Sequence, residues 1–371
     1  MDSFKGTYDR SLVRAARAVT GDVLAVRKEE RVLVITNPNA DSRQISMAIY
    51  DAVIDASATP VLLIQKEKGQ FDFLEYEGVK AIESGPDVVI SVSKDRLGKD
   101  RYGMKHGYKG KRQYDHIFDF LYEERKIRTF WSPGATVDMF ARTVPIDYTQ
   151  MRKDCKRICD VLLEADIVKV TAPGGTDVTI GIRGRKAHKD DGDFRKPGRG
   201  GNLPSGEVYI SPELGAMNGT IAWDGSIVLN EGEIVIRNPI FADVKGGYIT
   251  KVRGGSGAKR LEESVKVGES KAIEAGKKGQ MKPAKARIYA RNAWGIGELG
   301  IGLNRKAKIT ANMLEDEKVY GTCHFAIGSN YDGDHEAMIH LDGLVKSPTI
   351  TAVRKDGKEL PIMSDGKLSW D

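Results

Sequence analysis

Three short apolar runs, separated by two segments of helical spacing, dominate the first quarter of the chain. The runs lie at 31–37, 60–64 and 87–92. Between the first two, Ile45, Ala48, Ile49 and Val53 repeat on one helical face, and a second helix is predicted around 74–84. A strand–helix–strand–helix–strand order implies a parallel sheet with right-handed crossovers. These residues therefore predict a Rossmann-like parallel α/β domain over residues 1–164, with Asp41 or Ser42 capping the first crossover helix.

The first strand–helix turn does not have the chemistry of a nucleotide site. It has the sequence Thr-Asn-Pro-Asn-Ala-Asp over residues 36–41, without a glycine that would let a pyrophosphate approach the backbone. We therefore expect no dinucleotide to bind here.

The second half of the chain has the pattern of a different domain. Runs at 167–171 and 177–183 flank a Pro-Gly-Gly-Thr turn and predict a hairpin, and short strands continue to about 252. A charged helix is expected at 257–277 and a strand at 286–290. Residues 165–371 are therefore predicted to form a strand-rich, mixed α+β metal-binding domain that follows a closing helix at 149–164.

Composition excludes several functional classes. The net charge of +6 is spread over 58 basic and 52 acidic residues, too diffusely to indicate nucleic-acid binding. No run approaches the roughly 18 apolar residues of a membrane span. Three cysteines form no disulfide pattern, so a cytoplasmic, reduced protein is expected. The basic stretch 94–113 is interpreted as a solvated, mobile loop.

The most informative site signal lies near the C-terminus. His340 and Asp342 are two residues apart, so on a strand both side chains point to the same face. A neighbouring strand that carries His324 could complete three sides of a divalent metal ion. Imidazole and carboxylate ligands suit zinc, cobalt, manganese or ferrous iron, and no nearby cysteine pair suggests a closed structural zinc site.

Two glutamates upstream have unusual surroundings. Glu207 follows a Pro-Ser-Gly turn and opens an apolar strand, where a carboxylate needs a partner. Glu298 lies inside a literal GxGxxG that begins at Gly295, but outside any strand–helix–strand unit. A glutamate there would repel a pyrophosphate. We therefore interpret the glycines as space for close backbone packing around a metal-bound carboxylate.

Other polar residues are less specific. One acid of the run 315–317 could act as a general base, but spacing does not select which one. The phenol of Tyr331 could ligate a metal or donate to an oxyanion, or Tyr331 could be an ordinary half-buried tyrosine. His335 is expected to be exposed in a loop, and His106, His116 and His188 are expected to be solvated.

Together these segments resemble the aminopeptidase S/T family of metallo-aminopeptidases. The resemblance rests on five motifs in the family's order: Asn-Leu-Pro-Ser-Gly-Glu207-Val, Gly-Glu298-Leu-Gly-Ile-Gly-Leu-Asn, His324-Phe-Ala-Ile-Gly, Tyr331 and His340-Leu-Asp342. Two departures are visible: the interval from Tyr331 to His340 is shorter, and the acidic run before His324 is offset by about two residues.

The resemblance implies a hydrolase that removes N-terminal residues from peptides, with a water activated by two divalent ions. The implied ligands are Glu207, Glu298, His324, Tyr331, His340 and Asp342. Glu317 would be the base and Tyr331 a further catalytic residue, and family members form homodimers. The same superfamily includes Fe(II)-dependent dihydroxypyridine dioxygenases, whose two-histidine, one-carboxylate site His324, His340 and Asp342 would satisfy; this is the alternative. A non-catalytic metal-binding protein is a third hypothesis.

Overall fold

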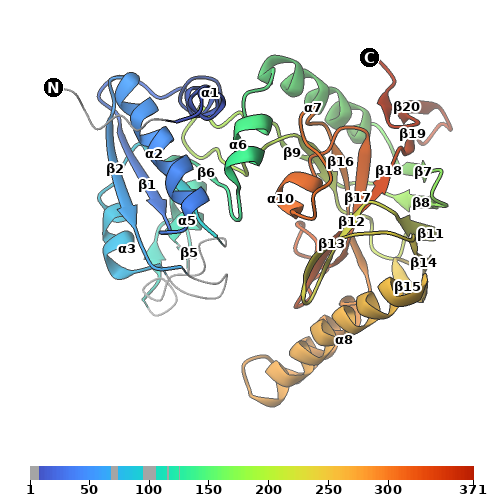
Figure 1. The fold of residues 1–371 in the computed structure, drawn as a ribbon. Helices are drawn as coiled ribbons and strands as arrows, with labels where there is room; N and C mark the ends of the chain where they lie inside the picture. Colours follow the sequence, from blue (N-terminus) through green and yellow to red (C-terminus); the bar gives the residue numbers. More distant parts are fainter. Residues whose placement is uncertain (1–7, 68–73, 95–105, 115–116, 125) are drawn as a thin grey trace. The chain divides into compact units, whose positions relative to one another are not determined.

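The computed structural model describes residues 8–67, 74–94, 106–114, 117–124 and 126–371 (Figure 1). The chain divides into two compact units. One comprises residues 1–152 and 190–205, and the other comprises residues 153–189 and 206–371. Much of the predicted loop at 94–113, together with His116, lies outside the described residues. Within the described residues, no helix combines the length and apolar character needed to cross a membrane.

The first unit is built on a parallel sheet. Its strand order is β2–β1–β3–β6, and each neighbouring pair is parallel. The strands are β1 (Arg31–Thr36), β2 (Thr59–Ile64), β3 (Val88–Val92) and β6 (Arg128–Trp131); a small hairpin, β4 (Tyr108–Lys109) and β5 (Gln113–Tyr114), lies beyond β3 in sequence. The run in β3 is buried throughout, as expected of a parallel strand covered on both faces.

Helices precede, connect and follow these strands. They are α1 (Arg10–Ala18), the π-helical turn η1 (Val19–Val23), α2 (Ala40–Asp55), α3 (Tyr76–Glu83), α5 (Ile117–Glu123) and α6 (Val137–Thr143). The cap of α2 differs from the prediction. The helix begins at Ala40, and the Asn39 side chain accepts a hydrogen bond from the Ser42 amide. Asp41 instead accepts a hydrogen bond from the amide of Val137.

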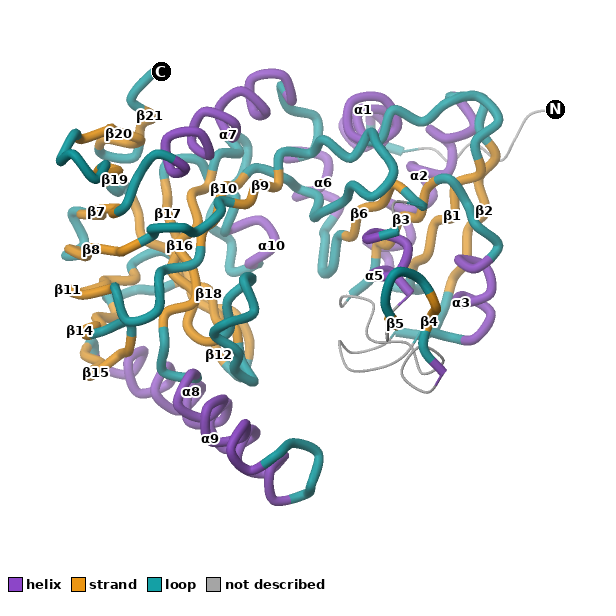
Figure 2. Tube along the Cα trace, turned by 180° about the vertical axis from the view of Figure 1, so that it is seen from behind, coloured by secondary structure: helices purple, strands orange, loops and turns teal. Residues whose placement is uncertain are grey.

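The second unit contains two mostly antiparallel sheets (Figure 2). One has the order β13–β12–β18–β17–β16–β10–β9, and the other β15–β14–β11–β8–β7–β19–β20–β21. The first is formed by β9 (His188–Asp190), β10 (Glu207–Ile210), β12 (Ser226–Leu229), β13 (Gly232–Val235), β16 (Ile296–Gly302), β17 (Thr322–Gly328) and β18 (His340–Lys346). The second is formed by β7 (Ile167–Thr171), β8 (Asp177–Gly181), β11 (Met217–Trp223), β14 (Ile240–Lys245), β15 (Tyr248–Arg253), β19 (Thr349–Val353), β20 (Glu359–Ser364) and β21 (Lys367–Leu368). The parallel sheet followed by strand-rich sheets confirms the predicted fold class.

Four further helices lie between residues 148 and 316. Helix α7 (Tyr148–Leu163) crosses from the first unit to the second, and α10 (Met313–Asp316) is one short turn. Helices α8 (Gly255–Lys277) and α9 (Pro283–Asn292) pack together as a helical hairpin. The strand predicted at 286–290 was wrong, because these residues belong to α9. Pro283 starts that helix favourably, and Ala286 packs closely against Gly276 of α8.

Trp223 fills the core between the two sheets of the second unit. It ends β11 and is completely buried. Strand β18 of the facing sheet passes over it at Gly343, where a Cβ atom would lie 2.4 Å from the indole Cδ1. Strand β18 also carries His340 and Asp342, so this contact supports the face of the strand opposite those two side chains.

Replacing Trp223 tests that support. We expect Trp223→Ala to lower the free energy of unfolding by about 3–5 kcal/mol, because it leaves a large cavity under β18. Trp223→Phe should cost clearly less, since it keeps most of the ring volume. Chemical denaturation of the metal-free proteins measures both values. A Trp223→Ala variant as stable as the Phe control would show that the sheets do not depend on this side chain.

Candidate metal centre

One face of the seven-stranded sheet collects the acidic and histidine residues singled out by sequence. In the antiparallel register Glu298 lies opposite Ala326, which lies opposite Asp342. His324 lies opposite Gly300, and His340 opposite Gly328. Because residues directly opposite each other share a face, strands β16, β17 and β18 present these side chains together.

Strand β10 adds a fourth element to this face. Glu207 pairs with Gly302, and Tyr209 pairs with Gly300. Glycine at positions 300 and 302 leaves room above the sheet. A Cβ atom at Gly300 would lie 2.0 Å from Nε2 of His324, and one at Gly302 would lie 2.2 Å from the carbonyl oxygen of Val319. The GxGxxG-like segment is therefore a strand whose missing side chains make space for the His324 ring and a neighbouring turn.

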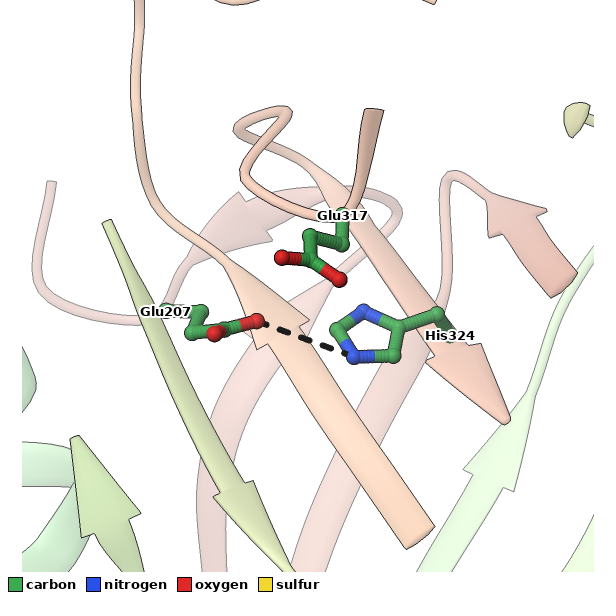
Figure 3. A group of neighbouring side chains, drawn as sticks. All are labelled: Glu207, Glu317 and His324. Carbon is green, nitrogen blue, oxygen red and sulfur yellow. Dashed lines mark ion pairs between the residues drawn. The ribbon is translucent and has the colours of Figure 1, made fainter. Parts of the chain in front are cut away.

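The side chains form a compact, mostly buried cluster. His324 Nε2 lies 3.2 Å from Glu298 Oε1 and 3.7 Å from Glu207 Oε2. His340 Nε2 lies 3.3 Å from Asp342 Oδ1 and 3.7 Å from Glu298 Oε2. In the described part of the chain, two triplets have potential ligand atoms within 4.8 Å of one another: Glu298, His324 and Asp342, and Glu207, Glu317 and His324. Figure 3 shows the second triplet, with all three side chains converging.

Hydrogen bonding orients His340 for ligation. Its Nδ1 lies 2.8 Å from the carbonyl oxygen of Ser329. A carbonyl oxygen only accepts, so Nδ1–H must be the donor. This leaves Nε2, the nitrogen facing Asp342 and Glu298, as the one able to bind a metal.

Unsatisfied polar atoms test whether these residues fit a metal ion. Among the described residues, Glu298 Oε2, Glu207 Oε2 and His324 Nδ1 are buried and have no hydrogen-bond partner. Buried polar atoms are normally paired, so several orphaned ligand atoms in one cluster suit a cation. The donor set of imidazole and carboxylate fits a divalent ion of the zinc, manganese or ferrous type.

The charges of the cluster shift its proton equilibria. Burial lowers the pKa of His324, but the hydrogen bond and charge of Glu298, with Glu207 and Asp342, outweigh it and raise that pKa to about 9. Burial likewise lowers the pKa of His340, and Asp342 outweighs it, raising the value to about 10. Burial raises the pKa of Asp342, yet the two histidines lower it to about 2. Without metal at pH 7, both imidazoles are therefore protonated on both nitrogens and positively charged.

Lys318 is a site residue that sequence reasoning missed. Its side chain is 0% exposed, and its ammonium lies 2.6 Å from Glu207 Oε1 and also bonds to Glu317. Burial raises the pKa of Glu317, and the nearby Lys318 ammonium opposes that rise. The only sequence signal was a lysine directly after the acidic run 315–317. The strand alternation that grouped the other residues does not extend to this turn.

Tyr331 lies at the edge of the cluster. Its side chain is 59% exposed, and its ring packs 5.0 Å from Tyr209 and 5.5 Å from His340, centroid to centroid. His188, predicted to be solvated, is half-buried and stacks on Tyr209 at 5.3 Å. We call His188, Tyr209 and Tyr331 the aromatic strip. Tyr209 could have been found from its position two residues after Glu207, on the same face of the strand.

His335 corrects another prediction. It was expected to be exposed but is only 5% exposed, with Nε2 3.2 Å from the carbonyl oxygen of Asn292. Its ring fills the space beside Gly295, where a Cβ atom would lie 2.1 Å from Nε2. Burial lowers the pKa of His335. It therefore has a packing role, whereas His106 is exposed as predicted.

A sequence model of the family described as 2,5-dihydroxypyridine 5,6-dioxygenase matches residues 20–369. A 2,5-dihydroxypyridine 5,6-dioxygenase from Pseudomonas putida is 24% identical over 193 residues. That alignment covers 49% of this chain and 49% of the relative, about half the relative's length.

Two solved structures share the fold. The 2,5-dihydroxypyridine dioxygenase from Pseudomonas putida KT2440 has a TM-score of 0.71 at 17% identity, and the alignment covers 99% of each chain. Wild-type AmpT from Thermus thermophilus has a TM-score of 0.65 at 16% identity, with 98% of this chain and 100% of that chain covered. At such identities the likeness concerns the fold alone.

Metal binding should release protons. Since His324 and His340 are protonated at pH 7 and a ligand must be neutral, a metal ion has to displace their protons. We expect its affinity to rise about 10- to 100-fold per pH unit between pH 6 and 8, below both pKa values. Calorimetry with manganese in buffers of different ionisation enthalpy counts the protons. The His106→Ala variant, changed at an exposed histidine outside the cluster, is the control and should release as many protons as the wild type. No proton release at pH 7 would contradict the assigned charges.

Proposed function

Since the chain belongs to the 2,5-dihydroxypyridine 5,6-dioxygenase family, we propose that it is a ring-opening dioxygenase that acts on a dihydroxylated pyridine with one ferrous ion. The observation that carries this proposal is the meeting of His324, His340 and Asp342 on one sheet face within the matched region. Two histidines and one carboxylate with open positions are the ligand set of non-haem Fe(II) oxygenases.

The family match corrects several predictions. The aminopeptidase activity, the hydrolase class and the peptide substrates were wrong, because the family model that spans residues 20–369 is that of a dioxygenase. What the motifs had detected is the fold, which AmpT shares. Because Glu317 was predicted as the base of peptide hydrolysis, that role no longer applies. The homodimer that the same resemblance implied stays a prediction.

The ligand residues are proposed as follows. His324, His340 and Asp342 would hold the iron, which supplies the electron-transfer chemistry that lets dioxygen react with an electron-rich ring. Glu298 Oε1 lies 3.2 Å from Nε2 of His324, so this carboxylate faces the same position and would border the ion. The Ser329 carbonyl accepts from Nδ1–H of His340 and would orient that imidazole from behind. Both oxygen atoms of O₂ enter the product as the ring C–C bond breaks, so no external reductant is needed.

The aromatic strip suits a planar substrate. Tyr209 and Tyr331 lie next to His340, and Tyr331 is largely exposed. Flat rings favour offset or edge-to-face packing against aromatic side chains. The strip would therefore hold a pyridine ring beside the ligands and orient its hydroxyl groups toward them. It would also offer little to an extended peptide backbone, which needs hydrogen-bond partners.

The ligands can be tested through iron content and oxygen uptake. The protein is first reconstituted with Fe(II) under nitrogen. In air-saturated buffer it should then consume oxygen when 2,5-dihydroxypyridine is added, and peptides should remain intact. His340→Ala and Asp342→Asn should each lower iron affinity on the order of 100-fold or more and abolish oxygen uptake, because no neighbour replaces the lost ligand. The exposed His106→Ala variant is the control and should retain both.

The opposite result is equally clear. Peptide cleavage that continues under nitrogen, without oxygen uptake on the pyridine, would refute the dioxygenase. Full iron content in His340→Ala would instead refute the ligand assignment and leave the reaction class open.

Two variants of Tyr331 distinguish packing of its ring on the substrate from ligation of the metal by its phenol. If the ring packs on the substrate, Tyr331→Ala should raise KM for the pyridine about 2- to 10-fold, the value of one aromatic contact. Tyr331→Phe should stay near wild type in both KM and iron content. If the phenol is a metal ligand instead, the Phe variant should lose iron affinity as the Ala variant does. Steady-state oxygen uptake and metal analysis of both variants distinguish the two roles.

A further inference from the structure

Two possible cation positions lie side by side in the cluster. The first is formed by Glu298, His324 and Asp342, and His340 approaches it. The second is formed by Glu207, Glu317 and His324. His324 belongs to both, so the positions are adjacent, as in a site for two metal ions. By ligand type alone, either could accept a divalent ion.

A side chain already lies in the second position. The ammonium of Lys318 donates to Glu207 Oε1 at 2.6 Å and to Glu317, two of the three members of that triplet. The lysine is completely buried, so its charge requires these carboxyl partners. A divalent ion bound to the same oxygens would have to displace the ammonium from them.

Hydrogen bonds to Asp316 and to the Lys318 carbonyl hold the turn that carries Lys318 in place. Asp316 accepts hydrogen bonds from the Thr310 amide at 2.7 Å and the Ala311 amide at 2.9 Å, and from the Ser226 hydroxyl at 2.5 Å. The Lys318 carbonyl accepts from the Asn304 amide at 2.7 Å, just beyond the end of β16. The backbone of Lys318 is thus tied to the site-bearing sheet, and its side chain is directed into the cluster.

We propose that Lys318 sets the metal count of the site. Its ammonium supplies the positive charge of the second position and confines the divalent ion to the first, next to His340 and Asp342. The inference rests on the metal centre proposed above and deepens it. A single-ion site suits oxygen activation by iron, whereas two ions about 3.5–4 Å apart are typical of metal-activated hydrolysis. Lys318 is therefore a specificity-determining residue, and it replaces the predicted second metal.

Metal counting on the full chain tests this inference. Chelated, desalted protein is titrated with Mn(II), which gives different paramagnetic resonance spectra for isolated and for spin-coupled ions. We expect one ion per chain in the wild type. Lys318→Ala removes the ammonium and opens its space, so two ions per chain with a spin-coupled spectrum are expected. Lys318→Arg keeps the charge and should bind one, as should Lys308→Ala, a control at an exposed lysine on the same connection.

The outcomes separate this inference from the proposed function. Two ions in the wild type, or one ion in a folded Lys318→Ala variant, would overturn the role of Lys318. If Lys318→Ala does not fold, the wild-type titration decides: saturation at one ion supports the role, and a second, spin-coupled ion overturns it. No metal in the wild type would overturn the metal centre itself, and this inference with it. Failure of oxygen uptake on the pyridine would refute the reaction without changing the count.

Discussion

Four carboxyl groups that meet at one poorly solvated sheet face, three from its strands and one from a neighbouring turn, are the constraint around which the strand-rich unit is organised. Glu207, Glu298 and Asp342 are each less than a tenth exposed, and Glu317 lies beside them. Buried carboxylates are costly unless positive partners surround them. Two protonated imidazoles and one ammonium supply that charge here, and a metal ion can replace the imidazole protons. Folding and metal chemistry therefore depend on the same electrostatic balance.

Space on this face is as important as charge. The strand that carries Glu298 also has glycines at positions 300 and 302, and a side chain at either would collide with the His324 ring or with the turn at Val319. On the far side of the sheet, Gly343 makes room for Trp223. The small residues of β16 and β18 thus let a ring, a turn and an indole approach the sheet directly. This explains a glycine pattern that elsewhere would indicate a phosphate site.

The same fold supports different chemistries. This chain has a similar fold to a dihydroxypyridine dioxygenase and to AmpT, at sequence identities of 17% and 16%. A shared sheet can place acids and histidines at equivalent points, so fold and ligand type together do not determine a reaction. In this chain the surroundings of the cluster include a lysine between two carboxyl groups and an aromatic strip beside His340.

Local patterns in the sequence were sufficient for the fold class and for much of the cluster. The two-residue spacing of His340 and Asp342 placed both on one strand face, and continuous apolar runs predicted the parallel sheet. Such periodicities are properties of the backbone and need no tertiary information. The strand expected at 286–290 failed because packing against α8 favoured a helix there.

Tertiary structure alone decided which charges meet. Lys318 reaches Glu207 across 111 positions of sequence, and His335 is buried by contact with Asn292, 43 positions away. Motif order pointed to a peptidase because it records ligand types, and these are compatible with one metal or two. The sequence by itself determined most of the elements and the side chains on each site-bearing strand face, since both follow from local geometry. Only the folded chain decided how the buried charges are balanced, because that balance depends on distances between residues far apart in sequence.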